Sequence, residues 1–227
     1  MFSRSDILIE CVPNFSEGRD KTIINAIADE IRQTPFIQLL HIDIGFDANR
    51  TVYTYIGKPE AIVEATYKAI KKAYELIDMR VHKGKHPRMG ACDVCPFIPY
   101  QNISMETTKV YVEQLGKQLG TIGIPVYLYE KSATTEERKN LAYIRKGEYE
   151  AIPEKIKQEI WKPDFGSSVF NQKFGMMALG ARAFLIAYNI NLDTKDLSIG
   201  KKIAHAIRVE RDIKKDSQLQ HCKAIAW

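Results

Sequence analysis

The sequence predicts an α+β fold in which a ferredoxin-like β-α-β-β-α-β unit is followed by the opening β-α-β of a second, similar unit. Strand-like and helix-like patterns alternate in that order through the first part of the chain, and the same order begins again after residue 180. No apolar run reaches the roughly 18 residues that a membrane-spanning helix requires. We therefore expect two subdomains, residues 1–179 and residues 180–227.

The first three strands and the helix among them follow from the residue pattern. Ile7–Val12 is a short apolar run that predicts a buried strand. Asp20 is the expected N-cap of a helix that carries apolar residues at helical spacing as far as Gln33. Phe36–Ile44 and Arg50–Ile56 are predicted to be the next two strands, because β-branched and aromatic residues dominate them on either side of a turn.

A second helix and a fourth strand complete this unit. Pro59 stands where a first helical turn begins, and apolar residues follow it at helical spacing. Asp93–Ile98 is the fourth strand, and Pro96 within it indicates an edge position or a bulge. The remaining elements of the subdomain are expected in the order helix, strand, helix and helix, at Met105–Gly120, Pro125–Tyr129, Thr135–Arg145 and Pro153–Glu159.

The C-terminal part of the chain begins with an irregular segment. Trp161–Gly180 has three glycines and little periodicity, so we expect a long ordered linker or a binding loop. Arg182–Leu192 is the most strand-like segment of the sequence, and a helix is expected from Lys195 to Val209. Cys222–Trp227 opens another strand. Three elements bury a sheet face poorly by themselves, so we expect the chain to self-associate as a homodimer.

Composition is that of a soluble globular protein, with 45% hydrophobic and 27% charged residues. The net charge of +5 suits an anionic partner, although an ordinary solvated surface explains it equally well. No dense basic stripe or nucleic-acid-binding motif is present, so no nucleic acid is expected as a partner. Without a spanning helix or a secretory signal, we expect no membrane partner and a cytoplasmic location, where the four cysteines stay reduced.

The densest chemistry lies in Val81–Pro99, which joins a predicted helix to a predicted strand. Histidine titrates near neutral pH, so His82 and His86 are candidates for moving protons. Cys92 and Cys95 form a C-x-x-C pair, so a zinc site with the histidines is an alternative. We discount zinc, because a glycine and a proline keep the histidine pair off a helix and Cys95 follows the strand alternation as a core residue does.

Six sequence motifs, in the same order along the chain, resemble the formiminotransferase family. They are ECVPNFSEG at Glu10–Gly18, NRTVYTYIG at Asn49–Gly57, HPRMGACDVCPFIP at His86–Pro99, PVYLY at Pro125–Tyr129, PDFG at Pro163–Gly166 and GARAFLIAYNINL at Gly180–Leu192. The resemblance implies a domain of two sheet-bearing subdomains with folate bound in the cleft between them. This chain is expected to hold the first subdomain and the opening elements of the second.

The resemblance also implies an activity. A formimino group would pass from N-formimino-L-glutamate to N5 of tetrahydrofolate, which gives 5-formiminotetrahydrofolate and L-glutamate in histidine degradation. Tetrahydrofolate would be a co-substrate, with no tightly bound cofactor and no metal. The attacking nitrogen must lose a proton and the leaving amine must gain one, and a single group with a pKa near neutrality serves both steps.

The resemblance assigns roles to residues on both sides of the histidine loop. The catalytic residues would be His86, which precedes the Pro-Arg-Met-Gly run, and Asp43, which ends the second predicted strand and would orient the imidazole or hold the amidinium of the donor. Asn49, Arg50 and Arg88 would bind substrate, since arginine forks match carboxylates. The structural alternatives are a turn aspartate and surface salt bridges.

The segment Pro163–Gly175 would be the folate-contacting loop by the same resemblance. Aromatic rings would stack on the pterin or benzoyl ring, and glycines would permit close approach of the backbone. Aromatic residues that fix a linker to the core are the alternative. The substrate-binding residues expected here are Phe165, Gly166, Ser167, Ser168, Phe170, Phe174 and Gly175.

Three further functional readings stay open at this point. A close variant of the reaction would use N-formylglutamate and 5-formyltetrahydrofolate. A folate-binding or dimer-partner protein without turnover would keep the motifs but not the activity. A zinc-stabilised binding module would use the paired histidines and cysteines for structure.

Overall fold

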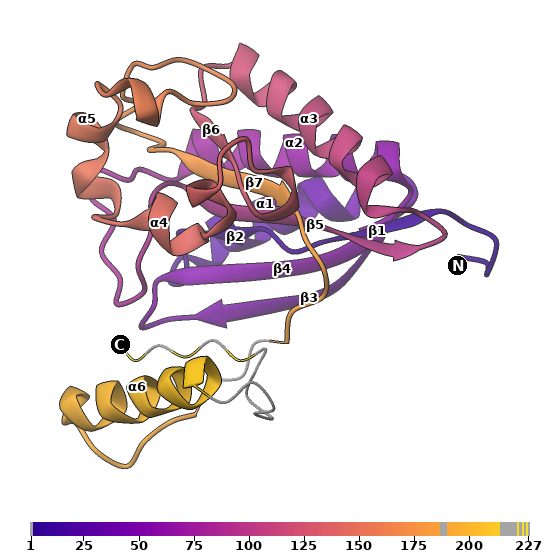
Figure 1. The fold of residues 1–227 in the computed structure, drawn as a ribbon. Coiled ribbons are helices and arrows are strands. Elements are labelled where there is room, and N and C mark those ends of the chain that lie inside the picture. The colour runs from indigo at the N-terminus through magenta and orange to yellow at the C-terminus, as the bar shows by residue number, and fades with distance from the viewer. Residues whose placement is uncertain (1, 187–189, 214–221, 223, 225, 227) are drawn as a thin grey trace. The chain divides into compact units, whose positions relative to one another are not determined.

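The computed structural model describes residues 2–186, 190–213, 222, 224 and 226 of the chain, which divides into two compact units, Met1–Phe184 and Leu185–Trp227. The first unit is built on one seven-stranded sheet (Figure 1). Among the described residues, no helix has both the length and the apolar character that crossing a bilayer requires.

The ferredoxin-like arrangement is confirmed. The strands that form it are β1 (Leu8–Cys11), β2 (Asn14–Phe15), β3 (Ile37–Gly45), β4 (Arg50–Gly57) and β5 (Cys92–Gln101). β3 pairs with β4, and both β1 and β2 pair with β4 on one side and with β5 on the other, always antiparallel. Two parallel strands extend this sheet, since β7 (Met177–Ala181) adds to β5 and β6 (Val126–Leu128) adds to β7.

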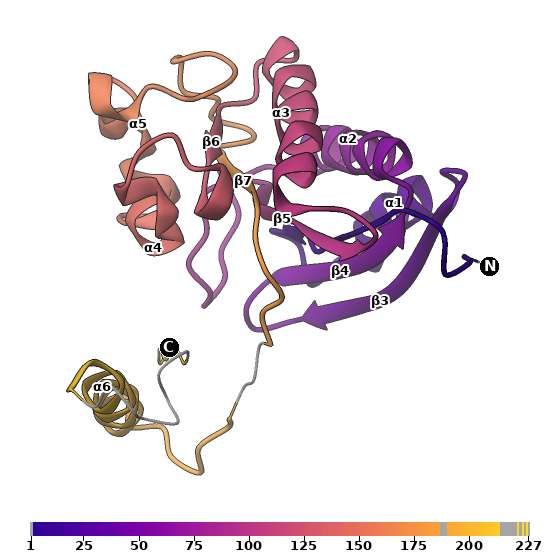
Figure 2. The ribbon, with the colours of Figure 1, turned by 45° about the vertical axis from the view of Figure 1, so that its right-hand side comes forward.

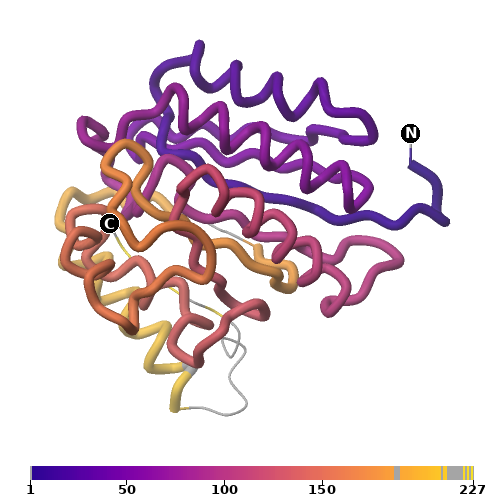
Figure 3. Tube along the Cα trace, turned by 90° about the horizontal axis from the view of Figure 1, so that it is seen from above, coloured from indigo at the N-terminus to yellow at the C-terminus, as the bar shows by residue number. Residues whose placement is uncertain are grey.

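Three helices cover one face of the sheet: α1 (Lys21–Arg32), α2 (Pro59–Leu76) and α3 (Met105–Thr121). Seen from above, they lie side by side (Figure 3). The predicted start signals are confirmed, because the Asp20 side chain accepts hydrogen bonds from the first turn of α1 and Pro59 begins α2. The main hydrophobic core lies between these helices and the sheet.

Short helical pieces cover the second face at the β6 end of the sheet, where Figure 2 shows α4 and α5. They are η1 (Glu130–Ser132), η2 (Glu137–Lys139), α4 (Leu141–Arg145), η3 (Tyr149–Ala151), α5 (Ile152–Lys155) and η4 (Glu159–Trp161). The two helices expected here, Thr135–Arg145 and Pro153–Glu159, are formed only in part, as α4 and α5. Positive φ angles at Gly147 and Glu148 break the helical conformation of the backbone between α4 and η3. A second apolar cluster, which includes Tyr127 and Trp161, lies under this cover.

The edge position expected for Pro96 is wrong, since β5 has neighbours on both sides. Pro96 lies opposite the interruption between β1 and β2, where its carbonyl oxygen accepts a 3.2 Å hydrogen bond from the Val12 amide. On the other side it faces Gly180 of β7. A break in the neighbouring strand therefore accommodates the missing N–H donor that usually keeps proline out of central strands.

The expected strand at Arg182–Leu192 is not formed by the described residues of that segment, 182–186 and 190–192. The strand lies earlier, at β7, so the boundary expected after residue 179 falls within the sheet. The Arg182 amide continues the pairing with β5 by one hydrogen bond, donating to the Phe97 carbonyl at 3.0 Å. Phe184 and Ile186 are exposed, and a strand without neighbours to pair with is not stable.

The second unit contains the predicted helix, α6 (Leu197–Ile213), and the amide of Ser198 in its first turn donates to the Asp196 side chain at 2.8 Å. The strand expected at Cys222–Trp227 falls mostly outside the described residues.

Candidate active site

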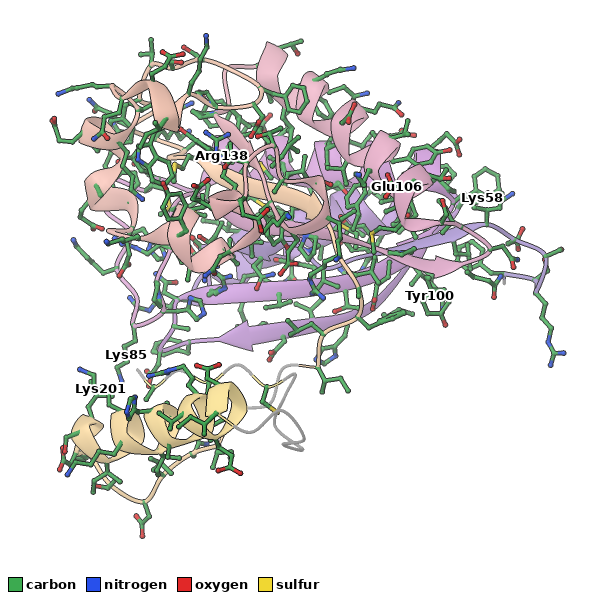
Figure 4. The ribbon with its side chains drawn as sticks, viewed as in Figure 1. Lys58, Lys85, Tyr100, Glu106, Arg138 and Lys201 are labelled. Carbon is green, nitrogen blue, oxygen red and sulfur yellow. The ribbon has the colours of Figure 1, made fainter. Side chains whose placement is uncertain are left out.

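The histidine loop, defined here as residues 81–91, connects α2 to β5 and is held by three other segments. Its Lys85 amide donates to Asp47 in the β3–β4 turn at 3.1 Å. Its Arg88 carbonyl accepts from Tyr149 at 2.9 Å, and its Ala91 amide donates to Phe174 at 2.8 Å. The exposed Lys85 side chain is labelled on this loop in Figure 4. The loop therefore has a fixed path from one end to the other.

Asn49 and His82 form the first of these attachments. The Asn49 side chain is buried, accepts from the Gly18 amide at 2.9 Å and donates to the Lys83 carbonyl at 3.0 Å. His82 Nε2 lies 2.9 Å from the Asn49 carbonyl oxygen and donates to it. Burial lowers the pKa of His82, so the ring stays neutral. Asn49 thus supports the loop, its expected role in substrate binding stays a prediction, and the contact of His82 is structural.

Gly84 lets the loop approach the β3–β4 turn. A Cβ atom at this position would lie 2.1 Å from the Ala48 carbonyl oxygen, which is far closer than van der Waals contact. We expect Gly84→Ala to lower the free energy of unfolding by about 1–3 kcal/mol, measured by urea denaturation. Lys85→Ala is the control, because that side chain is exposed and loses only a surface ion pair. Equal stability of the two variants would contradict the prediction.

The guanidinium group of Arg88 forms ion pairs within the protein and is not left open to a ligand on both of its Nη atoms. Its side chain is 8% exposed, and Nη1 and Nη2 donate to both carboxylate oxygens of Glu150 at 2.8 and 2.6 Å. Nη1 also donates to Glu148 at 3.0 Å. The hydrogen bonds from Arg88 lower the pKa of Glu150 to about 2. Two carboxylates of the protein thus occupy donors of Arg88, and the expected binding of a substrate carboxylate by this residue stays a prediction.

Asp93 is the centre of a buried charge cluster. β2 pairs with β5 on either side of Asp93 and not with Asp93 itself, so this residue lies at a β-bulge. Its Oδ2 accepts 2.6 Å hydrogen bonds from Arg50 Nη1 and Arg145 Nη2, and its Oδ1 accepts from the Met89 amide at 2.9 Å. Arg50 Nε also donates to Asn14 at 3.2 Å. Burial alone would raise the pKa of Asp93, but the two guanidinium groups hold it below the ordinary value.

Asp93 and Arg145 belong to the site, although neither is among the functional residues predicted from the sequence. An aspartate in an otherwise apolar strand was the available signal, because a buried carboxylate needs a charged partner. Nothing in the sequence pattern indicates that the partner from the later part of the chain is Arg145.

His86 lies beside this cluster and is half-buried. Its Nδ1 is 2.7 Å from the Pro87 carbonyl oxygen, so the tautomer that fits has the proton on Nδ1 and the lone pair on Nε2. Burial, and next to it the positive charges of Arg50 and Arg145, lower the pKa of His86 to about 4, while the hydrogen bond to Pro87 and the charge of Asp93 oppose this shift. At neutral pH the ring is therefore an uncharged base.

Asp43 lies on the sheet face opposite α1 and α2. It pairs in register with Val52, whereas its neighbour Ile42 packs against the main core. The Asp43 side chain is exposed. Arg50, two residues before Val52 along β4, projects to the same face and reaches Asp93 there. Asp43 stays a predicted catalytic residue on the face that carries the charge cluster.

The first part of the expected folate loop packs against other elements of the first unit. The Phe165 ring fills the space beside Gly116 of α3, where an added Cβ would lie 2.4 Å from it. Gly166 has a φ of +88°, and a Cβ there would lie 2.1 Å from the Ile124 carbonyl oxygen. Asp164 pairs with the buried Arg138, which is labelled in Figure 4, at 2.8 Å. The PDFG motif therefore joins the loop to α3, and the ligand roles expected for Phe165 and Gly166 stay predictions.

The last part of the loop supports the histidine loop. Phe174 is fully buried and packs edge-on against Tyr74, with ring centroids 5.6 Å apart. Gly175 has a φ of +83°, and a Cβ there would lie 2.1 Å from the Met89 carbonyl oxygen. Both residues thus belong to the core and its contact with residues 89–91. The substrate-binding roles expected for Phe174, by ring stacking, and for Gly175, by close backbone approach, stay predictions.

The middle of the loop keeps the other three predicted residues at or near the surface. Ser168 is exposed and Ser167, which accepts from the Val169 amide at 3.0 Å, is half-buried. Phe170 is half-buried against Tyr149, with ring centroids 5.5 Å apart. These residues stay predictions for substrate binding.

The cysteines of the C-x-x-C pair are core residues. Cys92 and Cys95 are fully buried, and Cys95 Sγ lies 3.7 Å from the Cys11 sulfur. Burial raises the pKa of both thiols well above the ordinary value, so neither is a thiolate. In the part of the chain that the structure describes, no three His, Cys, Asp or Glu side chains are grouped to hold a metal ion.

Fold and site together define an α+β protein that holds a neutral, half-buried histidine next to excess positive charge. Comparison with known families matches residues 8–182 to the formiminotransferase domain, N-terminal subdomain. The chain therefore belongs to the formiminotransferase family.

Several curated proteins are similar to nearly the whole chain. It is 50% identical to formimidoyltransferase-cyclodeaminase of Gallus gallus and 49% identical to that of Dictyostelium discoideum, in each case over 97% of the chain. It spans only 41% of the length of those two relatives. Glutamate formimidoyltransferase of Thermoplasma acidophilum is 47% identical, and the chain spans 72% of it.

Proposed function

We propose that the protein transfers the formimino group of N-formimino-L-glutamate to N5 of tetrahydrofolate, yielding 5-formiminotetrahydrofolate and L-glutamate, a step of histidine degradation. The observation that carries the proposal is His86, an uncharged base that a fixed loop presents in a chain of this family. Relatives named glutamate formimidoyltransferase, 47% and 42% identical, support the reaction.

Both proton transfers are assigned to His86, whose pKa of about 4 lies below the near-neutral value expected from the sequence and favours the acid step over the base step. N5 of tetrahydrofolate attacks the amidine carbon, and Nε2 of His86 takes the proton that N5 releases. The tetrahedral adduct then expels the glutamate nitrogen, which leaves as an amine once the imidazolium returns that proton. The low pKa makes the imidazolium a strong acid, so it gives up the proton readily. The Asp43 carboxylate would hold the amidinium of the donor.

The test is a direct assay. The full chain is mixed with N-formimino-L-glutamate and tetrahydrofolate, and the formation of 5-formiminotetrahydrofolate is followed. Turnover supports the proposal. Folate binding without turnover would instead support a folate-binding or dimer-partner protein, the second candidate, which is kept because the matched family domain is the N-terminal subdomain.

The proton affinity of His86 can be measured separately from turnover. We expect the ring proton signals of His86 in an NMR titration to move with a midpoint near pH 4, because burial and two nearby guanidinium groups disfavour the imidazolium. The ring of His205, which is exposed on α6, serves as the internal comparison in the same titration. A midpoint for His86 at or above that of His205 would contradict the assignment of a neutral base.

The remaining features of the proposal concern assembly and location. We propose that tetrahydrofolate acts as a co-substrate with no tightly bound cofactor, and that the protein is a cytoplasmic homodimer. Exposed apolar side chains of the second unit, such as Ile190 and Ile203, support self-association. Analytical ultracentrifugation that finds only monomer at micromolar concentration would contradict the dimer.

A further inference from the structure

Three arginines near the histidine loop, the buried Arg50 and Arg88 and the half-buried Arg145, differ in their charge balance. Arg88 is paired with two carboxylates, Glu148 and Glu150, so its charge is more than neutralised. Arg50 and Arg145 share a single carboxylate, Asp93, so one positive charge is left over. An uncompensated charge is costly to bury, and a bound anion would remove that cost.

Arg50 and Arg145 also have unused donors. Arg50 donates through Nε and Nη1, and Arg145 donates through Nη2 alone. The other Nη atoms, Arg50 Nη2 and Arg145 Nη1, have no acceptor among the described residues. Of the nitrogens of these two arginines, only Arg145 Nε is both fully buried and without a hydrogen-bond partner, so these two Nη atoms are not fully buried. Their side chains stay 9% and 16% exposed. Donors aimed at an anion are therefore available on both arginines.

The protein holds both guanidinium groups in place. Arg145 is the last residue of α4 and reaches across to the β5 bulge, while Arg50 begins β4. Asp93 fixes one Nη atom of each at 2.6 Å. The same carboxylate binds the Met89 amide three residues after His86, so the cluster and His86 belong to one rigid assembly. A preorganised pair of arginines binds carboxylate better than mobile side chains do.

We infer that Arg50 and Arg145 form a carboxylate subsite beside His86 that receives the α-carboxylate of the amino-acid donor. The inference rests on the proposed function and deepens it. Arg145, which no motif of the sequence indicated, becomes a residue that determines donor specificity.

The chemistry of the two substrates indicates that the subsite binds the donor and not tetrahydrofolate. In N-formimino-L-glutamate the reacting amidine is attached to the α-nitrogen, and the α-carboxylate is on the adjacent carbon. Any pose that brings the amidine carbon to His86 therefore brings the α-carboxylate close as well. In tetrahydrofolate the carboxylates lie beyond the aminobenzoyl ring, far from N5. An anion site next to the proton-transferring histidine thus matches the donor and not the folate tail.

Arg145→Met in the full chain tests this subsite by calorimetric titration. The variant leaves Arg50 and Asp93 as a balanced pair, so it is expected to fold. We expect the Kd for N-formimino-L-glutamate to rise at least tenfold and the Kd for tetrahydrofolate to change less than twofold. Lys146→Met is the matched control, since it removes a positive charge from the adjacent exposed residue, and donor affinity should stay within twofold.

The second ligand for this test is a donor analogue without the α-carboxylate, N-formimino-4-aminobutyrate. Two proteins and two ligands then form a thermodynamic cycle. We expect wild type and Arg145→Met to bind it with the same Kd, because the contact that the variant removes does not exist for this ligand. The inference is overturned if the variant weakens both ligands equally or weakens neither. If wild type binds neither the donor nor the analogue, the proposed function itself fails. Unchanged affinity in the variant with normal turnover overturns only the subsite.

Discussion

Replacing His86 by alanine is expected to lower kcat for formimino transfer by about 10²–10⁴-fold, the usual contribution of one positioned acid–base group. Without the imidazole, the attacking nitrogen and the leaving amine must exchange protons with water. Because His86 is half-buried and outside the main core, the variant should keep the fold. The affinity for tetrahydrofolate, measured by fluorescence titration, is expected to stay within a few-fold.

The matched control for this experiment is His205→Ala, which removes an exposed histidine of α6. It should leave kcat unchanged. A His86→Ala variant with normal folate affinity and more than a tenth of wild-type turnover would show that proton transfer does not depend on this ring. Partial recovery of the lost rate by added imidazole would support the proposed role directly.

Replacing Asp93 by alanine is expected to cost about 3–5 kcal/mol of the free energy of unfolding, because it leaves the buried Arg50 and the half-buried Arg145 without a carboxylate. The side chain is fully buried, and it accepts hydrogen bonds from Arg50, Arg145 and the Met89 amide. The measurement is urea denaturation. Asp93→Asn keeps one carbonyl acceptor, so its free energy of unfolding should lie between those of wild type and Asp93→Ala. It is expected to stay folded under conditions in which Asp93→Ala unfolds.

Asp47→Ala is the control for Asp93. It also removes one carboxylate from an ion pair, but Asp47 and its partner Lys85 are 76% and 70% exposed. Exposed pairs contribute about 0–1 kcal/mol, so this variant should resemble wild type. If the Asp93 and Asp47 variants were equally stable, the charge cluster would not hold the β5 bulge in the way described above.

The ferredoxin-like part of the fold could be read from local pattern. Asp20 caps α1 and Pro59 begins α2, and such signals act within a few residues of the chain. Pro96 was misplaced because its tolerance depends on a break in a neighbouring strand, between β1 and β2, which lies elsewhere in the sequence. Local pattern carries no information about such distant pairings.

The site was predictable to a smaller extent, for a similar reason. His86 could be proposed from its neighbours and from the family resemblance. Asn49 and Arg88 carry chemistry typical of substrate binding, yet their donors are directed at the histidine loop and at two glutamates. Residue type indicates what a side chain can bind, while the tertiary structure determines what it does bind. The same holds for Phe174, an aromatic that is fully buried.

The position of β7 between β5 and β6 has a consequence for synthesis on the ribosome. β5 and β6 emerge well before Met177–Ala181, the strand that must be placed between them. During that interval β5 exposes an unpaired edge next to an apolar core, a state prone to aggregation. Completion of the sheet thus waits for almost the last residue of the first unit. A nascent chain stalled before that point would be a substrate for chaperones.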